Sequence, residues 1–375
     1  MSNFKKKIIL LGTAHPFRGG LASYNERLAK EFIAQGYEFI IYTFTVQYPN
    51  FLFPGKTQYS SSPKPNNLVI ERKINSVNPF NWLKIGLELR KMKPDVVISK
   101  FWIPFIGPSL GTINRIAKSK KTKILSILDN VIPHEKRVGD KLLSKYYVSS
   151  VDGFIAMSES VQNDLKQFTN KTCLLNPHPL FDNFGKSVAK ETALDKLKLD
   201  KTKRYILFFG FIRDYKGLDI LLEAMSYKSL KESNIQLIVA GEYYSNEQTY
   251  LDLIEKYQIR DKVELFTEFI PNEDVAKYFG AADLVVQPYK TATQSGITQI
   301  AYHFEKPMIV TDVGGLKEIV PEGKVGFVVK PKAEELAKAI VKFYESDIDF
   351  QKHIKEEKKK YAWSRMLEKI EHLMS

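Results

Sequence analysis

Cysteine is almost missing from this chain, and long apolar runs are missing altogether. The single cysteine, Cys173, excludes an internal disulfide and a cysteine-based metal cluster, and it fits a reducing compartment. The six histidines show no metal-ligand spacing, so we expect no metal and no other cofactor. No stretch approaches the roughly 18 apolar residues that a membrane-spanning helix needs. The start, MSNFKKKIILLG, has too short an apolar run for a signal peptide and predicts a first β-strand.

Acidic residues are scarce in the first half of the chain. Residues 1–180 hold 26 Lys or Arg against 12 Asp or Glu, a balance of +14, whereas residues 181–375 hold 30 against 31. Such asymmetry favours an anionic partner, although a lysine-rich background would also produce it. No nucleic-acid motif or aromatic–basic interleaving is present, so we expect no nucleic acid. An anionic membrane surface or acceptor is favoured, and the segment 101–108 (FWIPFIGP) either touches that surface or packs in the core.

The composition is that of a soluble globular protein large enough for two domains, with 375 residues, 44% hydrophobic and 26% charged. Apolar strands alternate with longer amphipathic stretches, which predicts parallel sheets covered by helices on both faces. The expected strands are 8–11, 39–42, 95–98, 123–128 and 151–156, then 205–209, 235–240, 263–266, 284–286, 308–310 and 327–329.

The segment 176–192, rich in Pro, Asn and Gly, separates the two series of strands. We therefore expect an α/β protein with two doubly wound Rossmann-like domains, 1–180 and 181–359, facing each other across a cleft that binds ligands at the strand ends. The proline-rich segment 47–67 is expected to be an irregular loop.

The stretch 284–320 (LVVQPYKTATQSGITQIAYHFEKPMIVTDVGGLKEIV) contains two consecutive strand ends, each followed by a helix start. Ser295-Gly296 opens the first helix, and Gly314-Gly315 precede Glu318 at the second. Helix starts offer free backbone N–H groups and positive dipole ends, and glycine lets a ligand approach the main chain. A phosphate site is predicted here; two ordinary strand-to-helix turns are the alternative.

The stretch 207–225 (LFFGFIRDYKGLDILLEAM) is the second informative one. Its strand ends at Gly210, and a basic loop with Arg213 and Lys216 precedes Gly217 and a helix. Lysine and arginine at such a turn are suited to neutralise a diphosphate. A solvated basic turn is the alternative, and in either case we expect Lys216 to be a loop lysine that buries little surface.

Together these stretches resemble the GT-B glycosyltransferases, most closely the retaining, nucleotide-sugar-dependent enzymes of family 4. PFRGGLASYNERLAKEF is similar to the family's glycine-rich first loop and helix, and FFGFIRDYKGLDILLEA to its phosphate-binding turn. EKPMIVTDVGGLKEIV is similar to the end of its donor domain. YAWSRMLEKIEHLM resembles its terminal helix, which implies that residues of about 360–375 cross back onto the first domain.

The resemblance implies transfer of a sugar from a nucleoside-diphosphate sugar to a glycan or lipid-linked acceptor, with retention and without a metal. We expect such an enzyme to act in cell-envelope polysaccharide or glycoconjugate synthesis, in the cytoplasm and, because of the uneven charge, peripheral on the inner face of the cell membrane. The candidate catalytic residues are Asp129, Arg213 and Lys216. The candidate donor-binding residues are Gly210, Phe269, Ile270, Gln294, Ser295, Gly296, Ile297, Thr298, Gln299, Gly314, Gly315 and Glu318. The candidate acceptor-binding residues are Gly19, Gly20, Asn130 and His134.

Three positions depart from the family pattern. Phe211 stands where the family usually has arginine, with Arg213 close by to substitute for it. Ala292 and Ile300 stand where its paired glutamates fall. Asp129 stands where it often has histidine. These departures leave two alternatives open, a GT-B nucleotide-sugar epimerase and a non-catalytic nucleotide-sugar-binding protein. They leave the donor nucleotide among UDP, GDP and dTDP.

Overall fold

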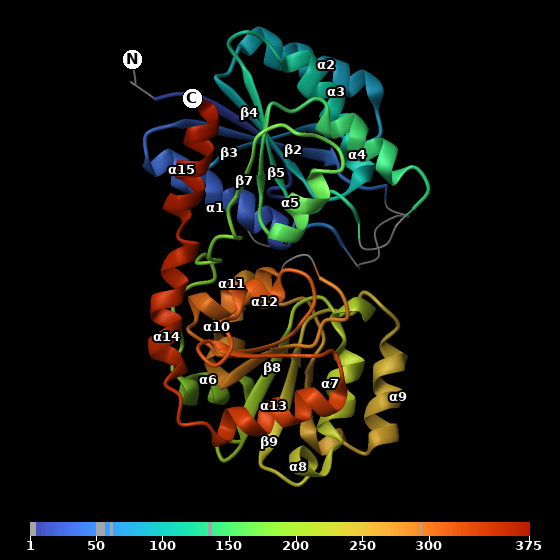
Figure 1. Cartoon of the computed structure of the whole chain (residues 1–375), viewed down its shortest axis with the longest axis vertical. Coiled ribbons are helices and arrows are strands. Elements are labelled where there is room, and N and C mark those ends of the chain that lie inside the picture. The colour runs from blue at the N-terminus through green and yellow to red at the C-terminus, as the bar shows by residue number, and fades with distance from the viewer. Residues whose placement is uncertain (1–4, 50–56, 61–62, 134–136, 293–294) are drawn as a thin grey trace. The chain divides into compact units, whose positions relative to one another are not determined.

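A computed structural model of the chain describes residues 5–49, 57–60, 63–133, 137–292 and 295–375 (Figure 1). The chain divides into two compact units. The first comprises Met1–Pro179 and Ala362–Ser375, and the second comprises Leu180–Tyr361. Each unit is built on its own parallel sheet, as the alternating pattern of the sequence predicts.

The first unit contains a seven-stranded sheet with the order β3-β2-β1-β4-β5-β6-β7, in which every neighbouring pair is parallel. Its strands are β1 (Lys7–Leu11), β2 (Glu38–Val46), β3 (Val69–Asn75), β4 (Val96–Phe101), β5 (Lys123–Leu128), β6 (Gly153–Ala156) and β7 (Cys173–Leu175). Its helices are α1 (Gly20–Ala34), α2 (Pro79–Met92), α3 (Gly107–Ala117), α4 (Asp140–Val148), α5 (Glu159–Leu165) and α15 (Trp363–Met374).

The second unit contains a six-stranded parallel sheet with the order β10-β9-β8-β11-β12-β13. Its strands are β8 (Arg204–Phe209), β9 (Ile235–Ala240), β10 (Val263–Phe266), β11 (Leu284–Gln287), β12 (Met308–Thr311) and β13 (Gly326–Val329). Its helices are α6 (Lys190–Leu197), α7 (Leu218–Met225), α8 (Lys228–Lys231), α9 (Glu247–Tyr257), α10 (Val275–Ala281), α11 (Gly296–His303), α12 (Leu316–Ile319), α13 (Ala333–Glu345) and α14 (Phe350–Glu357).

All eleven expected strands are present, but two further strands were not predicted. Only Ile70 and Ile74 of strand β3 are buried, and the strand carries three charges, Glu71, Arg72 and Lys73, because it is the edge strand of its sheet. Strand β7 forms the opposite edge and has only three residues. The prediction that the strand at 151–156 is the last of the first half is therefore wrong.

Helices α2, α3 and α4 pack side by side on one face of the first sheet (Figure 1). Their close approach depends on small residues in α2 and α3. A Cβ on Gly86 of α2 would lie 2.6 Å from the Cβ of Ile116 on α3, and a Cβ on Gly107 would lie 2.8 Å from the carbonyl oxygen of Leu143 on α4. The three helices therefore form one tightly packed layer.

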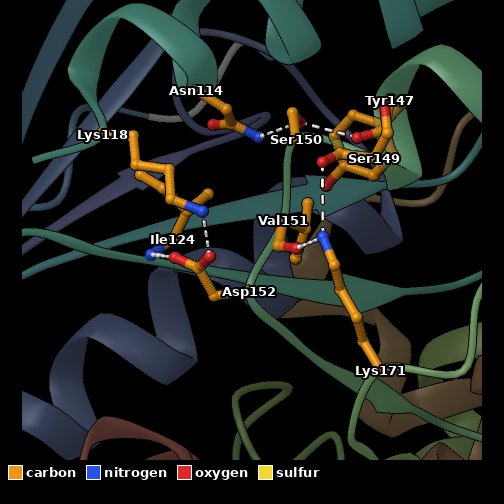
Figure 2. A network of polar contacts seen from close by, with 9 residues as sticks. All are labelled: Asn114, Lys118, Ile124, Tyr147, Ser149, Ser150, Val151, Asp152 and Lys171. Carbon is orange, nitrogen blue, oxygen red and sulfur yellow. Dashed lines mark hydrogen bonds and ion pairs between the residues drawn. The ribbon is translucent and has the colours of Figure 1, made fainter.

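A polar network anchors the end of α4 to this layer (Figure 2). The Asn114 amide of α3 donates to the Ser150 hydroxyl (3.3 Å), which donates to the carbonyl of Tyr147. The Lys171 ammonium donates to the carbonyls of Ser149 (3.3 Å) and Val151 (2.5 Å), where a cation complements the negative end of the α4 dipole.

The segment 101–108 packs in the core, which is one of the two alternatives that the sequence left open for it. Phe101 and Ile106 are fully buried, and Trp102, Ile103 and Phe105 are partly buried against the same cluster. Phe101 stacks on Tyr147 of α4 with ring centroids 4.0 Å apart. The apolar character of this segment therefore reflects packing beneath the helix layer.

We predict that Gly86→Val lowers the free energy of unfolding by about 1–3 kcal/mol, because the branched side chain has no room against Ile116. Leu87→Val is the matched control. It places the same residue on the exposed side of the same helix, where only helix propensity changes. Thermal unfolding measures both variants, and equal losses would show that α2 and α3 are not packed through Gly86.

Candidate functional site in the second unit

The second sheet changes direction between β8 and β11. Strand β8 is the first of its series and β11 the fourth, yet they are neighbours in the sheet. The connections that leave these two strands run to opposite sides, which opens a crevice at their carboxyl ends in doubly wound folds. The two stretches singled out in the sequence, the basic turn after β8 and the polar loop before α11, both begin at this point.

Glycines hold the turn after β8 against the end of β11. Gly217 has a φ of 69°, and a Cβ there would lie 2.0 Å from the carbonyl oxygen of Pro288. The backbone N–H of Lys290 donates to the carbonyl of Tyr215 (2.7 Å), which ties the same two segments together. A Cβ on Gly210 would lie 3.2 Å from both Lys216 Nζ and Ile297 Cδ1. The structure therefore brings Gly210, Lys216 and Ile297 together.

Lys216 is buried, with 8% of its surface exposed, so the expectation of a loop lysine that buries little surface is wrong. Among the described residues its ammonium makes no ion pair or hydrogen bond, and its nearest aromatic ring is Tyr289 at 5.8 Å. Burial, together with a smaller effect of the neighbouring charge of Arg213, lowers the pKa of Lys216 to about 7. A buried ammonium without a counter-charge makes this turn ready for an anion.

Helix α11 begins beside this lysine. The Ser295 hydroxyl caps the helix by accepting from the backbone N–H of Ile297 (3.2 Å), and it contacts the Tyr289 hydroxyl at 3.2 Å. The Thr298 hydroxyl is turned back to the carbonyl of Ser295, so the structure gives it a structural partner. Gln294 lies outside the described residues. Tyr289 was missed in the sequence, although it directly follows Pro288 at the strand end.

Packing, rather than the expected approach of a ligand, explains why residue 296 is a glycine. A Cβ at this position would lie 2.7 Å from Cε2 of Phe181, so the glycine is required by packing. Its presence therefore does not by itself indicate a ligand. The helix ends at His303, three residues before Lys306.

Gln299 is the clearest unsatisfied group at α11. The residue is fully buried, and in the described part of the chain neither its amide nitrogen nor its amide oxygen has a hydrogen-bond partner. Leaving a buried polar atom unpaired costs about 1–3 kcal/mol. Such a group in the first turn of α11 is suited to bind a hydroxyl of a ligand.

Three aromatic rings gather at the ends of β8, β9 and β10. Phe211 stacks on Tyr244 with centroids 4.3 Å apart and lies 6.5 Å from Phe269. The Arg213 guanidinium lies 5.1 Å from the Tyr244 ring. All three rings are partly exposed, as is Ile270, so this cluster offers apolar faces on which a planar base can stack. Tyr244 was not predicted from the sequence, because the predicted residues near it follow the strands at 205–209 and 263–266, whereas Tyr244 follows β9.

The loop after β12 contributes less than the sequence suggested. Gly314 has a φ of 48°, Gly315 is buried, and Glu318 is exposed. The helix that follows, α12, has only four residues, too few to build a useful dipole or a row of free N–H groups. These residues share the sheet edge with Lys216, two strands away from β8.

The first unit holds a second polar centre, at the ends of β4 and β5. Lys100 is fully buried, and its Nζ lies 3.1 Å from a carboxylate oxygen of Asp129 and 3.7 Å from the centroid of the Tyr24 ring. Burial lowers the pKa of Lys100, and Asp129 opposes this shift. The predicted Asp129 is therefore held as one half of a buried ion pair. Lys100 was missed, although a lysine that ends an apolar strand (VVISK) is a usable signal.

Other predicted acceptor residues are close to this centre in the sequence, at the start of α1 or directly after Asp129. Gly19, with a φ of 101°, is the N-cap of α1, and Gly20 is the first residue of that helix. Asn130 directly follows Asp129 and is partly exposed, whereas His134 lies outside the described residues. His178 packs edge-on against Tyr24 at 5.1 Å, and burial lowers its pKa to about 3, so the ring is neutral and donates from Nδ1 to the carbonyl of Pro179.

The fold and this arrangement define a class of protein. Two parallel-sheet Rossmann-like units constitute the GT-B glycosyltransferase architecture, as in sucrose-phosphate synthase from Thermosynechococcus elongatus (TM-score 0.76, 17% identity, 98% of each chain). A family model described as Glycosyltransferase Family 4 matches residues 18–172, and one described as Glycosyl transferases group 1 matches residues 189–361. The chain belongs to the GT-B glycosyltransferases of the family 4 type.

Two further relatives are informative. The chain is 26% identical over 266 residues to the glycosyltransferase TuaC of Bacillus subtilis (strain 168), which is named for teichuronic acid biosynthesis. It is similar in structure to Anabaena Alr3699/HepE in complex with UDP and glucose (TM-score 0.72, 16% identity, 98% of each chain). The TuaC match covers 70% of this chain and 64% of TuaC, and other curated relatives are covered over 43% and 33% of their lengths.

Two kinds of feature are absent from the described residues. No group of three or more His, Cys, Asp or Glu side chains is placed to hold a metal ion. No helix in the described part combines the length and apolar character needed to cross a bilayer.

We predict that Lys216→Ala lowers donor turnover by ~10- to 1000-fold, the loss typical of one charge-stabilising group. Nucleoside diphosphate affinity should also depend on pH. Because the pKa of Lys216 is about 7 in the free protein and a diphosphate favours the ammonium, affinity should fall by up to about tenfold per pH unit above that value. Calorimetric titration with the nucleoside diphosphate at pH values between roughly 6 and 9, a range that brackets the pKa of Lys216, measures this dependence.

The controls separate this effect from folding. In Lys290→Ala the lost ammonium was already neutralised by Asp214 (2.8 Å) and Asp219 (3.0 Å), so the pH dependence should remain. The free protein's stability should show the opposite sign. Between about pH 7 and 10.5 the unfolded lysine binds the extra proton, so stability should rise with pH in that window. A pH dependence of affinity that survives Lys216→Ala would remove Lys216 from the anion site.

We predict that Gln299→Met weakens donor binding while it leaves folding stability unchanged or raised. Methionine fills a similar volume and removes the two unpaired polar atoms, so the fold loses a penalty and the ligand loses a partner. Gln287→Met is the matched control, because Gln287 is also buried with an unpaired amide oxygen but lies within β11. Equal donor affinity in the two variants would show that Gln299 is a structural residue.

Proposed function

We propose that the chain is an enzyme that transfers a sugar from a nucleoside-diphosphate sugar to a glycan or lipid-linked acceptor with retention of configuration. The observation that carries this proposal is the buried ammonium of Lys216, which has no ion-pair partner among the described residues, at the switch point of the second sheet and beside the start of α11. Family membership supports it, and the UDP complex of Alr3699/HepE supports a nucleotide donor.

The proposed chemistry depends on the charge of the departing diphosphate. As the bond to the sugar breaks, negative charge grows on the diphosphate oxygen, and in the proposal Lys216, Arg213 and the first N–H groups of α11 stabilise this charge. A site whose donors are held by glycine-dependent packing needs little rearrangement during the reaction. Because the ammonium has a pKa of about 7, donor binding should also draw a proton onto Lys216.

The remaining donor contacts follow from the same edge of the sheet. In the proposal the base stacks on the cluster of Phe211, Tyr244 and Phe269, and Gln299 binds a ribose or sugar hydroxyl. Asp129, fixed by Lys100, orients a sugar or acceptor hydroxyl in the first unit. A metal is not part of the proposed mechanism, and chelator-insensitive turnover is the corresponding expectation.

The proposed setting is cell-envelope polysaccharide synthesis, with the protein in the cytoplasm and at an anionic membrane surface. The name of TuaC supports the pathway class, and the excess of 14 positive charges in residues 1–180 supports the surface. Two alternative functions are an epimerase and a non-catalytic nucleotide-sugar-binding protein. Both are suggested by Ala292 and Ile300, which stand in place of the family's paired glutamates.

A panel of UDP-, GDP- and dTDP-sugars tests the proposal. We expect one of them to release its free nucleoside diphosphate, with the rate increased by a glycan or lipid-linked acceptor, and the product linkage to keep the donor's anomeric configuration by NMR. Conversion of the sugar without release of nucleotide would establish the epimerase. Binding without any turnover, seen by calorimetry, would establish the non-catalytic protein. The Lys216→Ala variant serves as the control with reduced turnover.

A further inference from the structure

Exposed apolar side chains are distributed unevenly over the molecule. Of the twelve large apolar residues that are exposed in the described part of the chain, ten belong to the first unit and only Tyr227 and Ile348 to the second. The most exposed are Val138, Phe80 (84%) and Leu142 (70%). Gathered apolar surface of this kind marks an interaction site rather than ordinary exposure.

On α2 these side chains form a stripe. Phe80, Leu83 and Leu87 follow one another at i, i+3 and i+7, so they share one face of the helix. The opposite face of α2, with Ile85 and Leu89, is buried in the core. The helix therefore carries large apolar groups on its outer face as well as on its buried face.

A second stripe runs along α4. Val138 and Leu142 are spaced by four residues, and Val138 directly precedes the Gly139 N-cap. Helix α3 lies between the two stripes, and since neighbouring helices pack about 8–10 Å apart, the stripes are roughly 20 Å apart on one helix layer. We call the outer surface formed by Phe80, Leu83, Leu87, Val138 and Leu142 the α2–α4 face.

Cations surround the α2–α4 face. Lys84, Arg90, Lys91, Lys141 and Lys145 are exposed, and their side chains make no hydrogen bond or ion pair with described residues. Lys118 and Lys171, by contrast, are engaged in the network of Figure 2. Over residues 79–148 the sequence holds 14 Lys or Arg and 5 Asp or Glu.

The nearby carboxylates are too few to cancel these charges. Glu88 of α2 is bound to Lys73 and to the Tyr42 hydroxyl, and Asp140 of α4 accepts from the backbone N–H of Arg137. Helix α3, GPSLGTINRIA, contains no acidic residue. The face therefore combines apolar groups with uncompensated positive charge.

We propose that the α2–α4 face docks on an anionic lipid bilayer, with Phe80, Leu83, Leu87, Val138 and Leu142 inserted among the headgroups and the lysines on the lipid phosphates. This deepens the proposed membrane-facing function by naming the surface. A second copy of the chain is a poorer occupant, because a two-fold interface would set the same cations against each other. A bilayer offers both the apolar depth and the negative charge.

The test is co-sedimentation of the full chain with phosphatidylcholine vesicles that contain a rising share of phosphatidylglycerol, at low and physiological salt. We expect binding that grows with anionic lipid and weakens with salt. Phe80→Ser/Leu142→Ser should lower the partition coefficient by ~10-fold or more, and Lys84→Gln/Lys145→Gln by about fivefold for each lysine. Tyr227→Ser/Ile348→Ser, which removes exposed apolar groups of the second unit, should bind as the unaltered chain does.

Each result bears on a separate statement. Absence of binding to anionic vesicles at low salt, or equal binding by all variants, overturns the docking proposal. A dimer in sedimentation equilibrium that Phe80→Ser/Leu142→Ser dissociates assigns the face to a second copy instead. Nucleotide release from the donor in vesicle-free buffer is measured in parallel and should be the same for these variants. If the unaltered chain binds vesicles but releases no nucleotide from any donor, the proposed enzyme is overturned and the docking surface still stands.

Discussion

The pairing of β8 with β11 is the constraint on which the second unit depends. Two other strands of the sheet, β9 and β10, come between them in sequence, yet hydrogen bonding makes β8 and β11 neighbours. Their following loops must then diverge, and this divergence leaves main-chain N–H groups and the Lys216 side chain unshielded by a crossing connection. Gly217 and Gly210 let the loops approach closely enough that the lysine is buried without being neutralised.

Each unit buries a lysine near the end of a strand, but the charge of the two lysines is satisfied differently. Lys100 in the first unit is buried with a carboxylate partner, Asp129, so its charge is satisfied within the protein. Lys216 has no such partner in the described part of the chain, and its pKa falls to about 7. A buried pair fixes geometry, whereas a buried single charge stores an unmet electrostatic demand that a ligand can satisfy.

Much of the fold was predictable because buried parallel strands read as apolar runs bounded by turns. The edge strands β3 and β7 were not, since β3 is half exposed and charged and β7 is three residues long. In the site, strand-end positions were predictable for Gly210, Lys216 and Ser295. The environment of these residues was not. The burial of Lys216, the packing of Gly296 on Phe181 and the isolation of Gln299 arise from contacts across more than ten residues, which no local pattern encodes.

Helix α15 makes the first unit discontinuous in sequence. Its Trp363 packs on Tyr24 of α1 (5.2 Å), Arg27 lies 5.1 Å from the Trp363 ring, and Leu373 fills the space left by Gly153. During synthesis the sheet of the first unit emerges from the ribosome long before residues 363–374 exist, so α1 and β6 stay uncovered while the second unit is made. Domains usually complete their folding in the order of their synthesis. Here the unit that begins first should be the one that finishes last, and Tyr24, which lies against both Trp363 and Lys100, links that late event to the polar centre.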